Sequence, residues 1–185
     1  MFDNHYIAAL KQGNPSVQKE LVDFFSGKML SIARRYLADD HLAYDVLQES
    51  WIAIFNNIKT YQEEIAPLEA WIYRIVVNQS LKELKKRKRK IEFVAEFASE
   101  PEGIAPEILD TLQLELLFKY VCELPEGCRE VFNMYVFDEY SHKEIAAQLG
   151  INEGTSRSQL NRARKLLMEK IKTMDHVLIK KYETV

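Results

Sequence analysis

Two apolar stripes at helical spacing, separated by a glycine, mark the residues from 141 to 172. Ser141 and Glu144 match the S-x-x-E pattern of a capping box, so a short helix is expected to begin there. Gly150 predicts the end of this helix, because glycine readily adopts the left-handed backbone of a helix C-terminus. The next segment repeats apolar residues on one face, namely Leu160, Ala163, Leu167 and Ile171. The pattern predicts a helix-turn-helix.

The polar side of the second predicted helix is basic. It carries Arg157, Asn161, Arg164 and Lys165. The second helix of a helix-turn-helix enters the major groove of DNA, where arginine binds guanine and serine or asparagine can read other base edges. The alternative is the solvated face of an ordinary helical hairpin. Cap, turn and basic face agree with one another, which favours DNA binding.

The rest of the chain also has the pattern of helices. Alternating β-branched runs are missing, and six glycines with five prolines leave few hairpin signals. We therefore predict an all-α protein with two small helical domains joined by an acidic linker. The expected parts are a helical domain at 1–91, a linker at 92–110 holding Pro101, Gly103 and Pro106, a helix-turn-helix domain at 111–173 and a tail at 174–185.

Charge is segregated along the chain, although the net charge is only −3. Residues 81–90 hold seven basic side chains and one acid, and the last six of them are all basic. Residues 91–126 hold nine acids and a single basic residue, Lys119. Positive charge returns in the second predicted helix of the helix-turn-helix. Two basic regions separated by an acidic one predict two surfaces that face polyanions.

Other protein classes are disfavoured. No apolar run approaches the ~20 residues that a membrane span needs, and the N-terminus lacks the pattern of a secretory signal. Cys122 and Cys128 are expected to be reduced thiols, because one Cys-x5-Cys pair lacks the further ligands of a metal site. Four scattered histidines and no glycine-rich phosphate loop disfavour an enzyme. We expect a cytoplasmic protein with no catalytic activity, metal, cofactor, small-molecule substrate or direct membrane insertion.

The segment from 39 to 58 predicts an amphipathic helix with an acidic outer face. Its expected core side chains are Ala43, Leu47, Trp51, Ile54 and Ile58. This leaves a polar side formed by Asp45, Gln48, Glu49 and Asn56. Taken alone, such a face is more typical of solvated surface than of a binding site.

The segment from 71 to 90 predicts a helix with a basic stripe. Ile72, Ile75 and Val76 are expected to pack inward, and the stripe is formed by Arg74, Asn78, Lys82 and Lys85. Aromatic residues lie beside it in the sequence, namely Tyr61, Trp71 and Tyr73. Basic side chains with aromatic rings suit single-stranded DNA, whose bases stack on such rings. The alternatives are a core position for Trp71 and a solvated helix end for Lys85–Lys90.

Three stretches in this order resemble the bacterial sigma-factor family in its two-domain extracytoplasmic-function form. They are DDHLAYDVLQESWIAIF, WIYRIVVNQSLKELKKRKRK and LPEGCREVFNMYVFDEYSHKEIAAQLGINEGTSRSQLNRARKLL. The likeness extends from about Tyr6 to Lys172. It implies a promoter-specificity subunit of RNA polymerase whose helix at 39–58 docks on the clamp of the largest core subunit. The implied docking residues are Asp45, Gln48 and Glu49, with Ile52 as an apolar neighbour.

The resemblance also implies two DNA sites. The aromatic and basic residues of the segment from 61 to 85 would bind the single-stranded −10 promoter element, and Asn78 matches a family position near a flipped base. In the second half, the matched positions imply contacts to the −35 duplex by Arg157, Ser158, Asn161, Arg162 and Lys165. The expected partners are therefore core RNA polymerase, promoter DNA and an anti-sigma factor.

The sequence departs from the family pattern at two places. The loop before the basic helix, often Arg-Gly-x-Ser, contains two acids and no glycine between Tyr61 and Ala66. In the helix-turn-helix, Ser156 replaces an apolar residue and Gln159 replaces an arginine. Base preference at both elements is therefore open.

Two further expectations concern packing and a rival function. Helical spacing predicts a core role for Val131, Phe132, Tyr135 and Val136, Ile151 is expected in the core, and His142 is expected at the surface. The rival function is a helix-turn-helix regulator that binds duplex DNA without being a polymerase subunit.

Overall fold

The computed structural model describes the backbone of residues 2–93 and 112–182, with side chains at 2–88 and 116–172. Every regular element in these ranges is a helix, which confirms the predicted all-α class. The chain divides into two compact units, Met1–Ile104 and Ala105–Val185. The predicted linker at 92–110 lies outside the described residues, apart from the two residues that end a helix.

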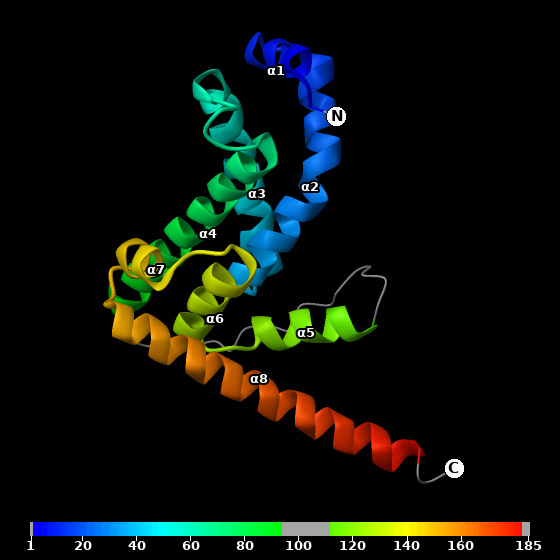
Figure 1. Cartoon of the computed structure of the whole chain (residues 1–185), viewed down its shortest axis with the longest axis vertical. Helices are drawn as coiled ribbons and strands as arrows, with labels where there is room; N and C mark the ends of the chain where they lie inside the picture. The colour runs from blue at the N-terminus through cyan, green and yellow to red at the C-terminus, as the bar shows by residue number, and fades with distance from the viewer. Residues whose placement is uncertain (1, 94–111, 183–185) are drawn as a thin grey trace. The chain divides into compact units, whose positions relative to one another are not determined.

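The first unit is a bundle of long helices (Figure 1). Three of them, α2, α3 and α4, pack against one another in every pairing, and α1 packs on α2. A short 3₁₀ turn, η1, follows α3. The bounds are α1 Asn4–Lys11, α2 Pro15–Leu37, α3 Asp40–Asn57, η1 Ile58–Thr60 and α4 Leu68–Phe93.

Local chemistry places the ends of α2 and α3. Asn14 caps α2 by accepting a hydrogen bond from the Ser16 amide at 3.0 Å, and Pro15 follows in the first turn, where its missing N–H costs nothing. The backbone of Ala38 turns left-handed with φ +52° and ends α2. Asp39 then caps α3 through the Leu42 amide. The two helices are thus joined by a turn of two residues.

The core of the first unit comes from the apolar faces of α2, α3 and α4. Its fully buried side chains include Phe25, Met29, Tyr36, Ile54, Ile72, Val76, Leu81 and Leu84. Each such side chain contributes about 1.5–3 kcal/mol relative to an exposed one. Ala43, Ile54 and Ile58 are buried as predicted. Leu47 and Trp51 are only half-buried, and Val46 and Ser50 occupy the core instead.

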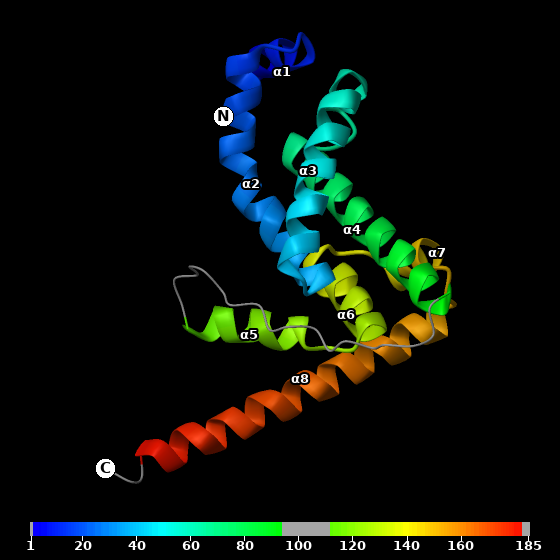
Figure 2. The same cartoon turned by 180° about the vertical axis from the view of Figure 1, so that it is seen from behind.

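The second unit contains the helix-turn-helix (Figure 2). Its elements are α5 Leu112–Cys122, α6 Glu126–Phe132, the π-helical turn η2 Asn133–Phe137, α7 His142–Leu149 and α8 Glu153–Tyr182. The predicted capping box of Ser141 and Glu144 is present. Gly150 follows α7 with φ +69°, as predicted.

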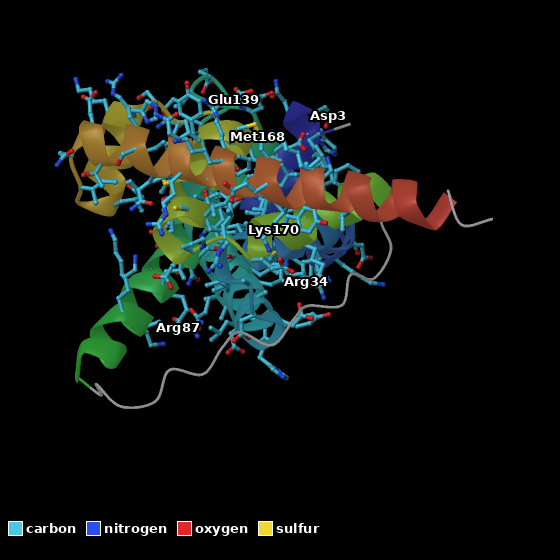
Figure 3. All side chains as sticks on the ribbon, turned by 90° about the horizontal axis from the view of Figure 1, so that it is seen from below. Asp3, Arg34, Arg87, Glu139, Met168 and Lys170 are labelled. Carbon is cyan, nitrogen blue, oxygen red and sulfur yellow. The ribbon has the colours of Figure 1, made fainter. Side chains whose placement is uncertain are left out.

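Helix α8 is the element on which the second unit is assembled. Its apolar face buries Leu160, Ala163 and Leu167 against α6 and α7. Lys170, labelled with Met168 in Figure 3, forms an ion pair with Glu123 and lies over the ring of Tyr120 at 5.5 Å. These contacts join the end of α5 to α8. The opposite face of α8 is left to solvent in the described part of the helix.

Three predicted core positions of the second unit are wrong. Tyr135 is 38% exposed and Val136 42% exposed, and Met134 is buried in their place. The cause is η2, where the Asp138 amide donates to the carbonyl of Asn133, five residues earlier. A π-helical turn inserts an extra residue and shifts the phase of the side chains. Ile171, 44% exposed, lies beyond the packed part of α8, and Ile151 is half-buried.

Replacing Gly150 with alanine should destabilise the second unit by about 1–2 kcal/mol, because its backbone is left-handed. A Cβ at this position would meet nothing within 4 Å, so the backbone alone sets this cost. Gly27 is the matched control, since it also has open space but lies inside α2 with an ordinary helical backbone. Gly27→Ala should stabilise the first unit by about 0.5–1 kcal/mol. Chemical denaturation followed by circular dichroism measures the change in unfolding free energy for both variants. Changes of the same sign would contradict a cost that arises from the left-handed backbone.

Candidate functional site

The outer face of α3 is polar with one apolar side chain. Asp45, Gln48, Glu49 and Ile52 are all exposed, and their spacing of three, four and seven residues places them on one side of the helix. Ile52 is 56% exposed. The opposite face is buried through Ala43, Val46, Ser50 and Ile54. Carboxylate and amide oxygens around an apolar side chain suit contact with arginines of a partner.

Tyr44 extends this face and was missed by the sequence reasoning. It is half-exposed, four residues before Gln48, and Arg34 lies over its ring at 5.8 Å. Arg34 also forms an ion pair of 2.7 Å with Asp40. The four-residue spacing of Tyr44, Gln48 and Ile52 indicates in the sequence that Tyr44 lies on the same side of the helix. An exposed aromatic ring is a common anchor of protein interfaces.

The basic stripe of α4 lies on the surface. Arg74, Asn78, Lys82 and Lys85 are exposed, and the opposite face buries Ile72, Val76, Val77, Leu81 and Leu84. Ile75 is half-buried. Arg87, labelled in Figure 3, extends the basic character toward the end of the described side chains. Such a stripe attracts a phosphate backbone without selecting its sequence.

Tyr61 does not lie where the sequence reasoning placed it. Its ring is only 2% exposed and lies 5.4 Å from that of Trp71, so a base cannot stack on it in this structure. The Tyr61 hydroxyl donates to the carbonyl of Ala66 at 3.0 Å, and Lys11 donates to the Tyr61 carbonyl at 2.7 Å. Burial raises the pKa of the phenol. Tyr61 therefore holds the loop before α4 in place.

Trp71 and Tyr73 are half-buried on α4. The Tyr73 hydroxyl donates to Glu69 at 2.8 Å, and its ring lies 6.0 Å from that of Phe25. Burial and Glu69 raise the pKa of Tyr73 well above its usual range. The hydrogen bonds from Tyr73 and Lys28 lower the pKa of Glu69. Only part of either ring is therefore available to a ligand.

The first turns of α8 present a continuous polar surface. Asn152 caps the helix by accepting from the Thr155 amide at 2.7 Å. The exposed residues are Arg157, Ser158, Asn161, Arg162 and Lys165. Arg157 forms an ion pair of 2.7 Å with Glu153, one turn earlier. The predicted base-reading residues are thus brought together at the start of one helix.

Two residues of α8, Ser156 and Gln159, depart from the family pattern, and neither belongs to the exposed polar surface of this helix. Ser156 is fully buried and shares a hydrogen bond of 2.8 Å with Nδ1 of His142. Gln159 is half-buried and accepts a hydrogen bond from the thiol of Cys128 at 2.8 Å. Burial raises the pKa of this thiol. Ser156 shares the helical spacing of Leu160, Ala163 and Leu167, which was the signal for its burial.

The described parts of the chain contain neither a candidate metal site nor a candidate membrane-spanning helix. No group of three or more His, Cys, Asp or Glu side chains there could hold a metal ion. No helix within the same residues is long and apolar enough to cross a membrane.

A helix with an acidic exposed face, a helix with a basic stripe and a helix-turn-helix follow one another in this chain, an order that is typical of a helical nucleic-acid-binding protein. Residues 21–90 match the family Sigma-70 region 2, and residues 114–167 match Sigma-70, region 4. Together the two matches span more than half of the chain. The chain belongs to the sigma-70 family of RNA polymerase sigma factors, in its extracytoplasmic-function (ECF) form. The predicted resemblance is confirmed.

Individual relatives agree with this assignment. The ECF RNA polymerase sigma factor SigW of Bacillus subtilis is 26% identical, with 91% of this chain and 96% of the relative covered. The ECF RNA polymerase sigma-E factor of Haemophilus influenzae is 27% identical, with 93% and 96% covered. Among solved structures, the sigma factor RpoE of Bartonella quintana, in complex with the anti-sigma factor NepR, has a similar fold. Its TM-score is 0.60 at 23% identity, over 83% of this chain and 96% of that one.

Tyr61→Phe should lower the stability of the first unit by about 0.5–1.5 kcal/mol, because it removes the hydrogen bond to Ala66 and keeps the ring. The matched control is Tyr44→Phe, which removes a hydroxyl from a half-exposed ring and should change stability by less than about 0.5 kcal/mol. Urea denaturation measures both variants. Equal effects would show that the Tyr61 hydroxyl does not anchor the loop.

Proposed function

We propose that this chain is a promoter-specificity subunit that binds core RNA polymerase and enables transcription from promoters with its own −35 and −10 elements. The observation that carries the proposal is the order of three exposed surfaces along a chain of the sigma-70 family. They are the acidic face of α3, the basic stripe of α4 and the first turns of α8. None of the three roles requires a catalytic step by this chain.

The acidic face of α3 is the proposed docking site for the clamp of the largest core subunit. Asp45 and Glu49 supply charge, Gln48 an amide and Ile52 an exposed apolar side chain. Charged contacts at such an interface steer the encounter, and the apolar side chain adds buried area. Tyr44, beside this face, is the proposed additional anchor.

The basic stripe of α4 is the proposed site for the single-stranded −10 element. Arg74, Lys82 and Lys85 supply positive charge, and Asn78 is the proposed contact to a base. Trp71 and Tyr73 keep partly exposed rings at the same helix. Tyr61 acts indirectly, because it holds the loop that precedes the helix. This division separates phosphate attraction from base recognition.

The first turns of α8 are the proposed site for the −35 duplex. Arg157, Ser158, Asn161 and Arg162 are exposed where a recognition helix meets base edges, and Lys165 is placed for the backbone. The half-buried Gln159 leaves this surface without the arginine of the usual family pattern. The preferred −35 sequence is therefore expected to differ from that of family members with the arginine.

An anti-sigma factor is the proposed regulatory partner. Two similar folds come from such complexes, RpoE with the anti-sigma factor NepR and CnrH with the cytosolic domain of CnrY. The CnrH structure has a TM-score of 0.53 at 21% identity and covers 94% of this chain. The exposed apolar side chains Ile52 and Tyr44 offer a surface that such a partner could cover.

A regulator that binds duplex DNA without polymerase is the rival function. It accounts for α7 and α8 and assigns the N-terminal helices to dimerisation or ligand sensing. It gives no reason for the order of acidic face, basic stripe and helix-turn-helix along the chain. In-vitro transcription with core polymerase decides between the two. Promoter-directed transcripts that require this chain support the sigma function, and transcripts that are the same without it would overturn the proposal.

Replacing Asp45, Gln48 and Glu49 together with alanine should weaken binding to core polymerase by at least about tenfold, or about 1.4 kcal/mol. The three side chains are exposed, so the fold should be kept. The control replaces two exposed acids of α2, Glu20 and Asp23, with alanine, which also removes two negative charges. Biolayer interferometry with core polymerase measures both. Equal affinities of the two variants would remove the docking role of α3.

Glu153→Gln should strengthen binding of the polymerase complex to a duplex with a −35 element by about two- to fivefold. The variant frees Arg157 from its ion pair and removes a negative charge near the phosphates. Fluorescence anisotropy at fixed salt measures the affinity, and Glu169→Gln, an exposed acid more than four turns later in α8, is the control. An unchanged or lower affinity would show that Arg157 does not contact this DNA.

A further inference from the structure

Two sequence-based expectations of the second unit fail at one place, where a departure from the family pattern also lies. Tyr135 was expected in the core and is exposed, His142 was expected at the surface and is half-buried, and Ser156 was noted as a polar residue at an apolar position. In the structure these side chains contact one another. The cluster belongs to none of the three surfaces described above.

The cluster links the first turns of the two helices of the helix-turn-helix. His142 is the first residue of α7, and its Nδ1 lies 2.8 Å from the hydroxyl of Ser156 in the first turn of α8. The Ser156 hydroxyl is fully buried, so this hydrogen bond is shielded from water. A hydrogen bond between two helices fixes their separation and rotation at the point where they touch.

A second set of contacts joins the same histidine to α8 about two turns after Ser156, at Arg164. The ring of Tyr135 stacks on the imidazole of His142, with centroids 4.6 Å apart and an interplanar angle of 22°. The guanidinium group of Arg164 lies over the ring of Tyr135, 5.9 Å from its centroid. His142 thus contacts Ser156 directly, and it is linked to Arg164 through the ring of Tyr135. Both ends of this chain of contacts belong to α8.

The π-helical turn makes this arrangement possible. A regular continuation of α6 would have turned Tyr135 inward, as its helical spacing predicted. The shift in phase at η2 brings the ring to the surface, where it meets His142. π-Helical turns inside helices are frequent at functional sites.

Burial, together with the nearby arginines, lowers the pKa of His142 and so favours a neutral imidazole. Burial lowers its pKa first, Arg157 and Arg164 act in the same direction, and Glu153 opposes them. Tyr135 on η2, which stacks on the ring, and Lys143, the next residue of α7, are further titratable groups beside it. A neutral ring has a single N–H, which leaves one ring nitrogen as an acceptor.

We propose that His142 and Ser156 form a positioning pair that sets the orientation of α8 on the −35 duplex and thereby its discrimination between DNA sequences. Ser156 is fully buried, His142 is half-buried, and Ser156 directly precedes Arg157 and Ser158 in α8. The pair therefore acts through the reading side chains and not by touching a base. A small rotation of α8 would move those side chains relative to the base edges while leaving phosphate attraction intact. The inference rests on the proposed function of α8.

The test compares His142→Asn with His142→Leu in the full chain bound to core polymerase. Asparagine and leucine have the same branched shape, and only asparagine keeps a hydrogen-bonding atom near the position of Nδ1. Both lose the stacking on Tyr135. Transcription from a promoter library with a randomised −35 region, followed by sequencing of the transcribed templates, gives the enrichment of favoured over disfavoured −35 sequences.

We expect His142→Asn to keep most of the wild-type enrichment and His142→Leu to reduce it by about two- to tenfold. Ser156→Ala should match His142→Leu. The double variant His142→Leu with Ser156→Ala should be no worse than either single variant, because both remove the same hydrogen bond. Thermal unfolding of all variants shows whether each one folds, and Lys143→Ala, an exposed neighbour on α7, should resemble the wild type.

The outcomes separate this inference from the function on which it rests. If the wild type enriches no −35 sequence, α8 does not read the promoter and the proposed function fails with the inference. If the wild type enriches a sequence and folded His142→Leu does so equally, the positioning pair is wrong and the sigma function stands. Equal losses in His142→Asn and His142→Leu would also overturn the pair, since stacking on Tyr135 would then explain the effect.

Discussion

Every candidate surface of this protein is the uncovered face of a helix whose other face is buried. In α3, burial of Ala43, Val46 and Ile54 places the acidic residues on the exposed face. In α4, burial of Ile72 and Val76 places the basic stripe on the exposed face. In α8 the buried Leu160, Ala163 and Leu167 fix which residues face out. Because a helix has 3.6 residues per turn, packing one face determines the other. The core therefore decides what each surface presents.

This constraint explains why much of the fold could be predicted from the sequence. Local signals such as Ser141 with Glu144, Gly150 and Pro15 depend on neighbouring residues only, and the structure places helix ends at each of them. The exposed residues of α3 and α8 followed from the same spacing. These predictions needed no knowledge of which helix packs on which.

The predictions that failed depend on contacts between distant residues or on an irregular turn. Aromatic residues near a basic helix predict that the Tyr61 ring stacks on DNA, whereas contacts with Lys11 and Trp71 bury this ring in the core. Tyr135 was assigned to the core from regular helical spacing, which the π-helical turn interrupts. No local sequence pattern predicts the burial of Tyr61 or the π-helical turn at Asn133–Phe137. The hydrogen bond between His142 and Ser156 belongs to the same class, since fourteen residues separate its partners.

The most direct test of the division of labour among the three surfaces is site-specific photo-cross-linking in the complex with core polymerase and promoter DNA. A photoreactive amino acid would replace Gln48, Asn78 or Asn161, which are exposed on α3, α4 and α8. The account predicts three different products: Gln48 with the largest core subunit, Asn78 with the −10 non-template strand and Asn161 with the −35 duplex. Cross-linking of Gln48 to DNA, or of Asn78 and Asn161 to the same promoter element, would contradict it.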